Sequence, residues 1–357
     1  MAAPGSHATA TVPAPSAGQP SPGLADLPAA PFPIFTTVDA YREWRRKAMV
    51  EGKSVGFVPT MGALHDGHMS LVRHSLLQND LTVLSIFVNP AQFAQNEDLA
   101  TYPRTLEADL TRMASLALPS PASPAGDALR SVSALFLPTV KEMYPSGIVQ
   151  NVDEQRGTFI DVKGYGHQME GQSRPTFFRG VATVVTKLFN AIEPTHAYFG
   201  QKDIQQALLL RRLVQDLLLS HPTPQNLHIV PTLRSSSDGL ALSSRNVYLT
   251  APERDVAGVL YAALKRGEEV WKAGGGRDGA VRNATEFVES CARDAEAKGV
   301  HVKLDYIEMN DPETFEIVDW DTRLEDGRPV ILSGAVWVGK TRLIDNILLG
   351  DASRLLM

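Results

Sequence analysis

Two closely spaced histidines are the side chains of this sequence best suited to phosphate chemistry. His65 and His68 stand three residues apart in the segment PTMGALHDGH, where Gly62 and Gly67 allow the backbone to approach a ligand closely. We expect a helix to begin near Gly67, so that its free N–H groups and its dipole form an anion site. Imidazoles at this spacing can face the same side of that first turn. The arrangement suits a phosphate chain that gains negative charge in a transition state.

The histidine pair has two simpler explanations when its residues are considered alone. Both could be surface histidines beside a tight turn, because motifs this short match by chance. They could also bind a metal ion, although no third His, Cys or carboxylate stands at ligand spacing. We therefore predict no metal site built by the protein itself.

Polar and glycine-rich segments follow the strands that the sequence predicts. Five short β-rich runs alternate with helical patterns, which indicates an α/β, Rossmann-like, doubly wound parallel sheet with helices on both faces. Sheets of this kind bind ligands beyond the carboxyl ends of their strands. The expected strands cover residues 54–58, 81–88, 134–137, 196–199 and 227–230, and the clearest helices cover 69–79, 181–192 and 205–219.

Several of these segments together resemble one enzyme family. PTMGALHDGH resembles the HxGH signature of nucleotidylyl-transferases, a superfamily that includes class I aminoacyl-tRNA synthetases. With SIFVNPAQF, YPRTLEAD, FRGVATVVTKLFN, FGQKDIQQ and DGLALSSRN, it resembles the pantothenate synthetase (pantoate–β-alanine ligase) family. The resemblance runs from about residue 34 to the C-terminus. It implies an AMP-forming ligase that joins pantoate to β-alanine through a pantoyl adenylate and releases pyrophosphate from ATP.

The resemblance also implies which residues form the site. Gln92 and Gln206 would bind pantoate and β-alanine, because a neutral amide can bond both hydroxyl and carboxylate groups. Mg²⁺ would arrive with ATP, since the sequence offers no dedicated ligand cluster. The residues expected to be catalytic are His65, His68, Lys202 and Arg245. The expected ATP-binding residues are Met61, Gly62, His65, Gly67, His68, Gly200, Lys202, Asp203, Leu233, Leu242, Ser243, Ser244 and Arg245.

Two of these implied groups also have plainer interpretations. Lys202 and Asp203 could form an exposed ion pair worth at most about 1 kcal/mol, rather than bind phosphate and ribose. The segment 242–245 could be an ordinary Ser-rich turn. The resemblance instead implies a mobile loop whose hydroxyls, amides and guanidinium suit a departing pyrophosphate.

This sequence departs from the family pattern at four places. Ala91 stands where the family usually has Met, Gln201 replaces its common Glu, and Phe177 replaces a frequent His. The role of that His is not carried over to this chain. One extra residue stands among Ser235–Ser237, which affects the placement of Leu233 as an adenine contact.

The segment Gly334–Thr341 matches the P-loop pattern letter for letter but does not fit its structure. Its middle, Ala-Val-Trp-Val, is bulky and β-prone, and it continues an apolar run that begins at Val330. A phosphate-binding loop needs small residues, with a strand before it and a helix after it. We predict a core strand here instead.

Length and composition indicate two domains and an N-terminal tail. The 357 residues are 43% hydrophobic and 21% charged, as in ordinary globular proteins. Residues 1–33 are rich in Ala and Pro and are predicted to be disordered. We expect the nucleotide-binding domain over 34–232, with a loop insertion at 118–133, and a smaller C-terminal α/β lid domain over 233–357. Within that lid, helices are expected over 251–273 and 280–298, and strands over 303–309 and 328–338.

Charge and cysteine content exclude some classes of protein. A net charge of −6 disfavours nucleic acid as a partner, and no apolar run approaches the roughly 20 residues that span a bilayer. One cysteine, Cys291, excludes internal disulfides and fits a cytoplasmic location. The alternatives are another HxGH adenylyltransferase, which would need a basic cluster near Gln92, or a catalytically silent nucleotide-binding regulator. The resemblance suggests a homodimer.

Overall fold

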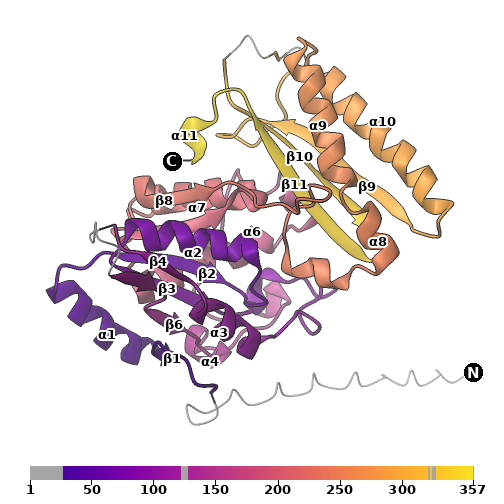
Figure 1. Cartoon of the computed structure of the whole chain (residues 1–357). Helices are drawn as coiled ribbons and strands as arrows, with labels where there is room; N and C mark the ends of the chain where they lie inside the picture. Colours follow the sequence, from indigo (N-terminus) through magenta and orange to yellow (C-terminus); the bar gives the residue numbers. More distant parts are fainter. Residues whose placement is uncertain (1–26, 122–127, 321, 324–326, 357) are drawn as a thin grey trace, which may run out of the picture.

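Two sheets organise the described part of the chain. The computed structural model describes residues 27–121, 128–320, 322–323 and 327–356. A six-stranded parallel sheet carries helices on both faces, and a three-stranded antiparallel sheet packs beside it (Figure 1). The predicted α/β class, with a doubly wound sheet and a smaller C-terminal α/β unit, is confirmed. Residues 1–26 of the predicted tail and residues 122–127 of the predicted insertion lie outside the described residues.

The order of strands in the large sheet creates a crevice beside its central strand. The order is β1-β6-β3-β2-β7-β8, and all neighbours are parallel. The chain runs from β2 outward through β3 and β6, then returns to start β7 on the other side of β2. Ligands bind where the strand order reverses in this way. The strands are β1 (Ile34–Phe35), β2 (Val55–Thr60), β3 (Leu81–Ile86), β6 (Ala134–Phe136), β7 (His196–Gly200) and β8 (Leu227–Val230).

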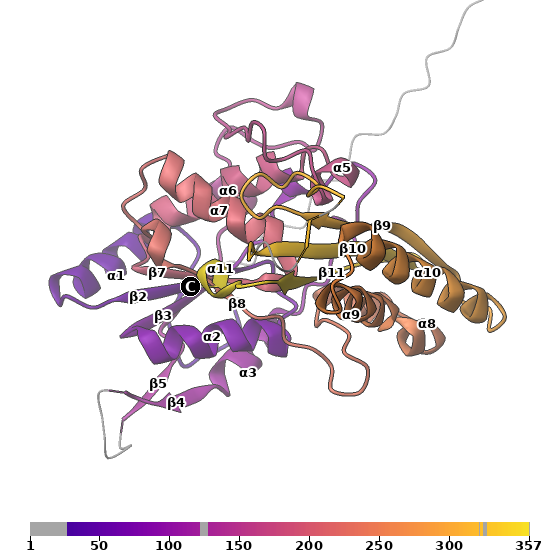
Figure 2. The same cartoon turned by 90° about the horizontal axis from the view of Figure 1, so that it is seen from above.

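Alternate residues of the central strands build a core on each face. Val55 and Phe57 of β2 lie in one apolar cluster, whereas Val58 lies in the cluster on the opposite face. Helices α2 (Asp66–Gln78) and α3 (Leu106–Ala114) cover one face, and α1 (Val38–Val50), α6 (Phe177–Ile192) and α7 (Ile204–Asp216) cover the other (Figure 2).

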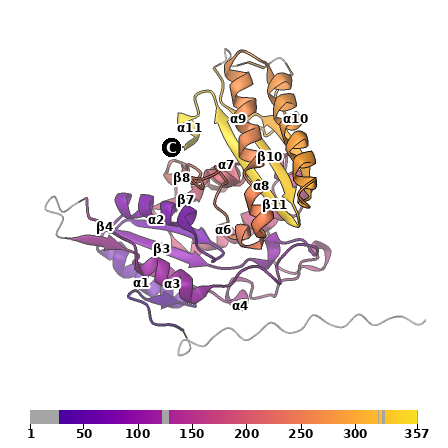
Figure 3. The same ribbon diagram turned by 45° about the vertical axis from the view of Figure 1, so that its right-hand side comes forward.

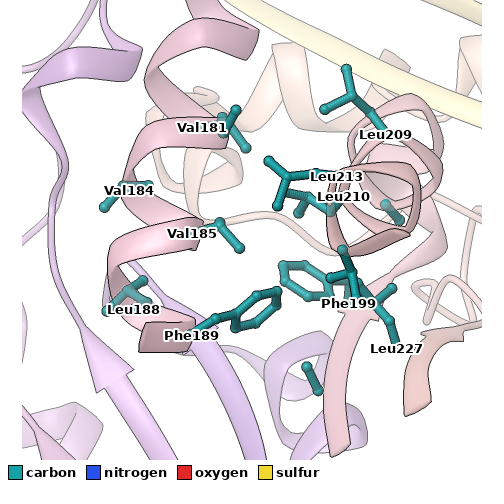
Figure 4. Close-up of a cluster of buried hydrophobic side chains, with 14 of the residues drawn as sticks. Val181, Val184, Val185, Leu188, Phe189, Phe199, Leu209, Leu210, Leu213 and Leu227 are labelled. Atoms are coloured by element: carbon teal, nitrogen blue, oxygen red, sulfur yellow. The ribbon is translucent and has the colours of Figure 1, made fainter. Parts of the chain in front are cut away.

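The apolar face of α6 packs against α7 and the end of the sheet. Figure 4 shows Val185 and Phe189 of α6 directed toward Leu210 and Leu213 of α7, with Phe199 of β7 between them. Val181, Val184, Val185 and Leu188 also line the cavity described below. The same helix face therefore forms both core and cavity wall.

The C-terminal unit is a three-stranded antiparallel sheet covered by the two long helices α9 and α10 (Figure 3). Gly339, with φ +56°, makes the turn between β10 and β11, so the P-loop look-alike is a core strand, as predicted. The helix expected over 251–273 is interrupted at Ala257–Gly258. The strands are β9 (Val302–Asn310), β10 (Val330–Val338) and β11 (Thr341–Leu349), and the helices are α8 (Ala251–Val256), α9 (Val259–Lys272), α10 (Arg277–Glu296) and α11 (Ser353–Leu356).

Two predicted boundaries differ from the structure. Part of the predicted tail is folded, because Phe32 is buried in the core and the carbonyl of Pro33 accepts from the Leu135 N–H at 3.0 Å. Within 118–133 the chain forms a β-ribbon of β4 (Ala117–Pro119) and β5 (Leu129–Ser131) rather than a simple loop.

Two further short helices are α4 (Val140–Met143) and α5 (Glu170–Ser173). Within the described residues, no helix is long and apolar enough to cross a bilayer.

Candidate active site

His65 and His68 lie at the start of α2, directly beyond the end of β2. His65 is the residue that caps the helix, and its Nδ1 accepts from the Gly67 N–H at 3.1 Å. The Nδ1 of His68 accepts from the His65 N–H at 3.4 Å, and the two ring centroids are 4.1 Å apart. A Cβ on Gly67 would lie 2.7 Å from the His65 ring, so this position requires glycine. The predicted pairing of the imidazoles at a helix N-terminus is present.

Both imidazoles are neutral at physiological pH. Burial, together with the charges of Lys202 and Arg112, lowers the pKa of His65 to about 4. Burial and the neighbouring His65 lower the pKa of His68 well below its usual value, and Lys202 adds to that effect. Because each Nδ1 accepts a backbone hydrogen bond, each neutral ring carries its proton on Nε2. Neither Nε2 has a hydrogen-bond partner among the described residues, so both can donate to a ligand.

The turn after β7 carries Lys202 and Asp203. The Lys202 ammonium lies 3.4 Å from the Asp203 carboxylate. The backbone of this turn is held by Asn346 of β11, whose Nδ2 donates to the carbonyls of Gln201 and Lys202 at 2.9 and 3.0 Å. The Gln201 amide donates in return to Asn346 Oδ1 at 3.1 Å. The C-terminal sheet therefore fixes the backbone beneath the candidate catalytic lysine.

The Ser-rich loop docks onto the histidine turn and onto the loop that carries Asp98. Ser244 Oγ donates to the carbonyl of Ala63, next to the histidine turn, at 3.0 Å. Arg245 forms two hydrogen bonds of 2.8 and 2.9 Å with the carboxylate of Asp98. Burial opposes ionisation of Asp98, but these bonds and the charge of Arg245 keep its pKa below the usual value. In this structure the guanidinium expected to bind pyrophosphate is engaged by Asp98.

Gln92 is held in place by a buried asparagine and a close helix contact. Asn89 Nδ2 donates to Gln92 Oε1 at 3.0 Å, and Gln92 Nε2 contacts Met61 Sδ at 3.3 Å. Asn89 also donates to the carbonyl of Gly180 in α6 at 3.2 Å. A Cβ on Gly180 would lie 2.1 Å from the Ala91 carbonyl oxygen, so glycine allows α6 to pack on this loop.

An arginine that the sequence analysis did not single out lies beside Gln92. Arg174 donates to the Gln92 carbonyl at 3.1 Å and to Glu97, and its guanidinium lies 3.8 Å from the Phe177 ring centroid. Phe177, which stands where the family often has His, thus supports this guanidinium. Among the described residues, the arginine that contacts Gln92 is already paired with Glu97.

Residues Ser235–Ser237 lie in a loop next to a short pairing of Leu233 with Leu242. The Leu242 N–H donates to the Leu233 carbonyl at 3.1 Å, and Arg234 pairs with Ala241 in a short antiparallel bridge. Leu233 and Leu242 therefore lie side by side.

One cavity of about 240 Å³ brings the predicted residues together. The predicted residues that line it are Met61, His65, Gly67, His68, Gln92, Gly200, Lys202, Asp203, Gln206, Leu233, Leu242, Ser243, Ser244 and Arg245. Gly62 does not line it; with φ +84° it shapes the turn behind Met61. Its walls come from the ends of β2, β7 and β8, from α6 and from the Ser-rich loop. No cluster of His, Cys, Asp and Glu able to hold a metal ion occurs within the described residues.

Besides Arg174, three further residues around the cavity were not singled out in the sequence analysis. Asp109, Asp98 and Asn346 hold the histidine turn, Arg245 and the Lys202 turn, respectively. Asp109 belongs to the segment YPRTLEAD, and that membership is a signal that could have identified it. Asn346 lies more than 140 residues from its partners, and no local pattern indicates the contact.

The fold and the site define an HxGH-type nucleotide-binding enzyme, in which paired imidazoles meet a lysine at the point where the strand order reverses. The pantoate-beta-alanine ligase family matches residues 33–348, and the chain belongs to this family. It is therefore a ligase. The match favours this interpretation over another HxGH adenylyltransferase or a silent regulator.

Relatives and solved structures agree with the family match. The chain is 43% identical over 316 residues to the pantothenate synthetase of Moorella thermoacetica, covering 88% of this chain and 98% of the relative. It is 40% identical to the pantoate–β-alanine ligase of Saccharomyces cerevisiae, covering 88% and 99% of the two chains. The pantothenate synthetase structure from Thermus thermophilus superimposes with a TM-score of 0.70 at 38% identity, covering 88% and 99%. The Francisella tularensis ligase, solved with β,γ-ATP and β-alanine, superimposes with a TM-score of 0.64 at 31% identity, covering 89% of this chain and 97% of the relative.

Proposed function

We propose that this chain ligates pantoate and β-alanine to form pantothenate, with ATP as the energy source. The observation that carries the proposal is one cavity whose lining includes His65, His68, Lys202, Gln92 and Gln206. Family membership supplies the reaction class. The ATP and β-alanine bound by the Francisella relative support the same substrates here.

The reaction would proceed in two steps within this cavity. A carboxylate oxygen of pantoate attacks the α-phosphorus of ATP, the bond to the β-phosphate oxygen breaks, and pyrophosphate leaves. The amine of β-alanine then attacks the activated carbonyl carbon, the bond to AMP breaks, and the amine loses its proton. Orientation and charge stabilisation suffice for both steps, so no protein nucleophile is required.

Each candidate residue has a defined task in this scheme. The Nε2–H groups of His65 and His68 donate to phosphate oxygens, and Lys202 neutralises charge between the carboxylate and the α-phosphate. Asp203 accepts from the ribose hydroxyls, and Arg245 exchanges its Asp98 partner for pyrophosphate. Mg²⁺ would enter as part of the ATP substrate.

We further propose that residues 233–357 form a lid domain on the nucleotide-binding domain of residues 34–232. A homodimer and a cytoplasmic location belong to the same proposal. Sedimentation velocity of the purified chain tests the dimer, and cell fractionation tests the location.

The deciding experiment is an ATP–pyrophosphate exchange assay. We expect exchange of labelled pyrophosphate into ATP only when pantoate is present, and AMP release only after β-alanine is added. Exchange without pantoate, or a product in which AMP stays attached to the acceptor, would favour another adenylyltransferase. Absence of all turnover with ATP still binding would favour the regulator.

A further inference from the structure

The backbone of the histidine turn is held by a buried carboxylate that does not line the cavity. Asp109, in the first turn of α3, is 2% exposed. Its Oδ2 accepts from the Ala63 N–H at 3.0 Å, and its Oδ1 accepts from the Leu64 N–H at 2.7 Å. Thr105 Oγ1 adds a third donor at 3.1 Å. Among the described residues no lysine or arginine forms an ion pair with Asp109. Burial raises the pKa of its carboxyl, whereas these three donors and the charge of Arg112 favour the ionised form.

The turn that Asp109 holds has an unfavourable backbone conformation. Gly62 and Ala63 both have positive φ, +84° and +49°, and Ala63 is not glycine. Left-handed conformations bring Cβ close to the following carbonyl oxygen, so a non-glycine residue needs support from its surroundings. Consecutive N–H groups in such a turn form a concave anion site. The Asp109 carboxylate occupies that concave site from inside the protein.

The same turn sets the geometry of the two histidines and of the Ser-rich loop. His65 follows Leu64 directly, and its N–H fixes the Nδ1 of His68. The carbonyl of Ala63 accepts from Ser244 Oγ, which anchors the Ser-rich loop. A rotation of the peptides at residues 63 and 64 would therefore move both imidazoles and this loop.

We propose that Asp109 is a positioning residue: its carboxylate, seated on the Ala63 and Leu64 N–H groups, holds the two imidazoles and the Ser244 loop in place for adenylate formation. The inference rests on the proposed function, which names the step. An amide at this position keeps the shape of the side chain but turns one acceptor into a donor that faces an N–H group. The turn then loses its support while the rest of α3 is unchanged.

The test compares D109N with E107Q, an exposed carboxylate-to-amide change in the same helical turn. We expect kcat for pantoate-dependent ATP–pyrophosphate exchange to fall about 100-fold in D109N, because displacements near 1 Å have effects of this size. The KM of D109N for pantoate should stay within about threefold of the parent value, since Gln92 and Gln206 lie on other elements. The kcat of E107Q should stay within about twofold of the parent value. Adding A63G to D109N should restore kcat about tenfold, because glycine adopts the left-handed conformation without strain.

A spectroscopic readout separates positioning from stability and from the reaction itself. Long-range ¹H–¹⁵N spectra, assigned with His65→Asn and His68→Asn variants, should show the Nε2–H tautomer for both rings in the parent and mixed tautomers in D109N. If D109N does not fold, T105V removes one donor and should shift tautomers and kcat in the same direction by a smaller factor. Unchanged tautomers and kcat in a folded variant would overturn the proposal. A parent without exchange activity would instead contradict the proposed function, and the tautomer comparison would still test Asp109.

Discussion

At the residue scale, the site depends on imidazoles that stay uncharged while they donate hydrogen bonds. Burial and neighbouring cations hold the pKa of His65 and His68 below the ordinary value. A neutral ring that accepts a backbone hydrogen bond at Nδ1 presents Nε2–H in one direction. Such fixed donors stabilise developing charge without reorganising during the reaction.

Replacing His68 with Ala should remove one of these donors and leave the fold intact. We expect adenylate formation to fall by about two to three orders of magnitude, as for other lost transition-state donors. ATP–pyrophosphate exchange measures the effect. His74→Ala is the matched control, because His74 is exposed on the same helix, and it should keep full activity. Near-normal exchange in the His68 variant would remove its phosphate role.

The lowered pKa of His65 predicts how stability depends on pH. The unfolded chain binds a proton on this ring near pH 6.5, whereas the folded chain does so near pH 4. Stability from this group is therefore complete above pH 6.5 and is lost as pH falls from 6.5 toward 4. Urea unfolding at pH 7, 5.5 and 4.5 measures this loss of the free energy of unfolding. His65→Asn, which caps a helix without titrating, should show a weaker pH dependence over this range.

At the scale of elements, strands and helices from different parts of the chain fix the catalytic turns. The Asn346–Gln201 amide pair joins β11 to the turn after β7. Gln201 stands where the family commonly has Glu, and here its amide donates to Asn346. Because Asn346 is 1% exposed, its loss would leave the carbonyls of Gln201 and Lys202 without these donors.

Asn346→Ala should affect both stability and catalysis. Buried carbonyls left without donors cost about 1–3 kcal/mol, and the freed turn should lower kcat about tenfold through Lys202. Asn226→Ala is a suitable control. The Asn226 amide donates to the Thr195 carbonyl at 3.0 Å, and neither residue lines the cavity. The control should lose stability without losing kcat. An Asn346 variant that loses only stability would contradict the positioning role.

At the scale of the whole molecule, a charged cluster joins the C-terminal sheet to helix α5. Arg342 of β11 bonds both carboxylate oxygens of Glu170 in α5, at 2.7 and 3.1 Å, and also bonds Asp305 of β9 at 2.9 Å. The Tyr306 hydroxyl donates to Glu170 at 3.0 Å. The side chains of Arg342 and Glu170 are 14% and 11% exposed, so solvent screens this pair little.

Arg342→Ala should weaken the contact between the C-terminal sheet and helix α5. Removing one partner of a buried ion pair costs about 3–5 kcal/mol, because the other charge is left uncompensated. Urea unfolding followed by tryptophan fluorescence should show this loss. Lys163→Ala, which breaks an exposed pair with Asp161, should cause little change. A comparable loss of stability in both variants would mean that the cluster does not hold the C-terminal sheet to helix α5.

Much of the fold follows from local patterns, because buried strands and amphipathic helices have periods that the sequence displays. Five of the six strands of the large sheet and helices α2, α6 and α7 were predicted close to their observed positions. The short edge strand β1 was not, since two residues carry no periodic signal. Helix α3, with Asp109 at its first turn, was also not predicted as an element.

The sequence by itself determined the chemistry of the site, because His65, His68, Lys202 and Arg245 stand in segments whose residue types and order identify the family. Only the tertiary structure decided how that chemistry is held. Asp109, Asp98 and Asn346 act through hydrogen bonds to segments 45 to 147 residues away. Such contacts depend on the packing of whole elements; a motif marks the segment of Asp109, but no local pattern shows which backbone its carboxylate reaches.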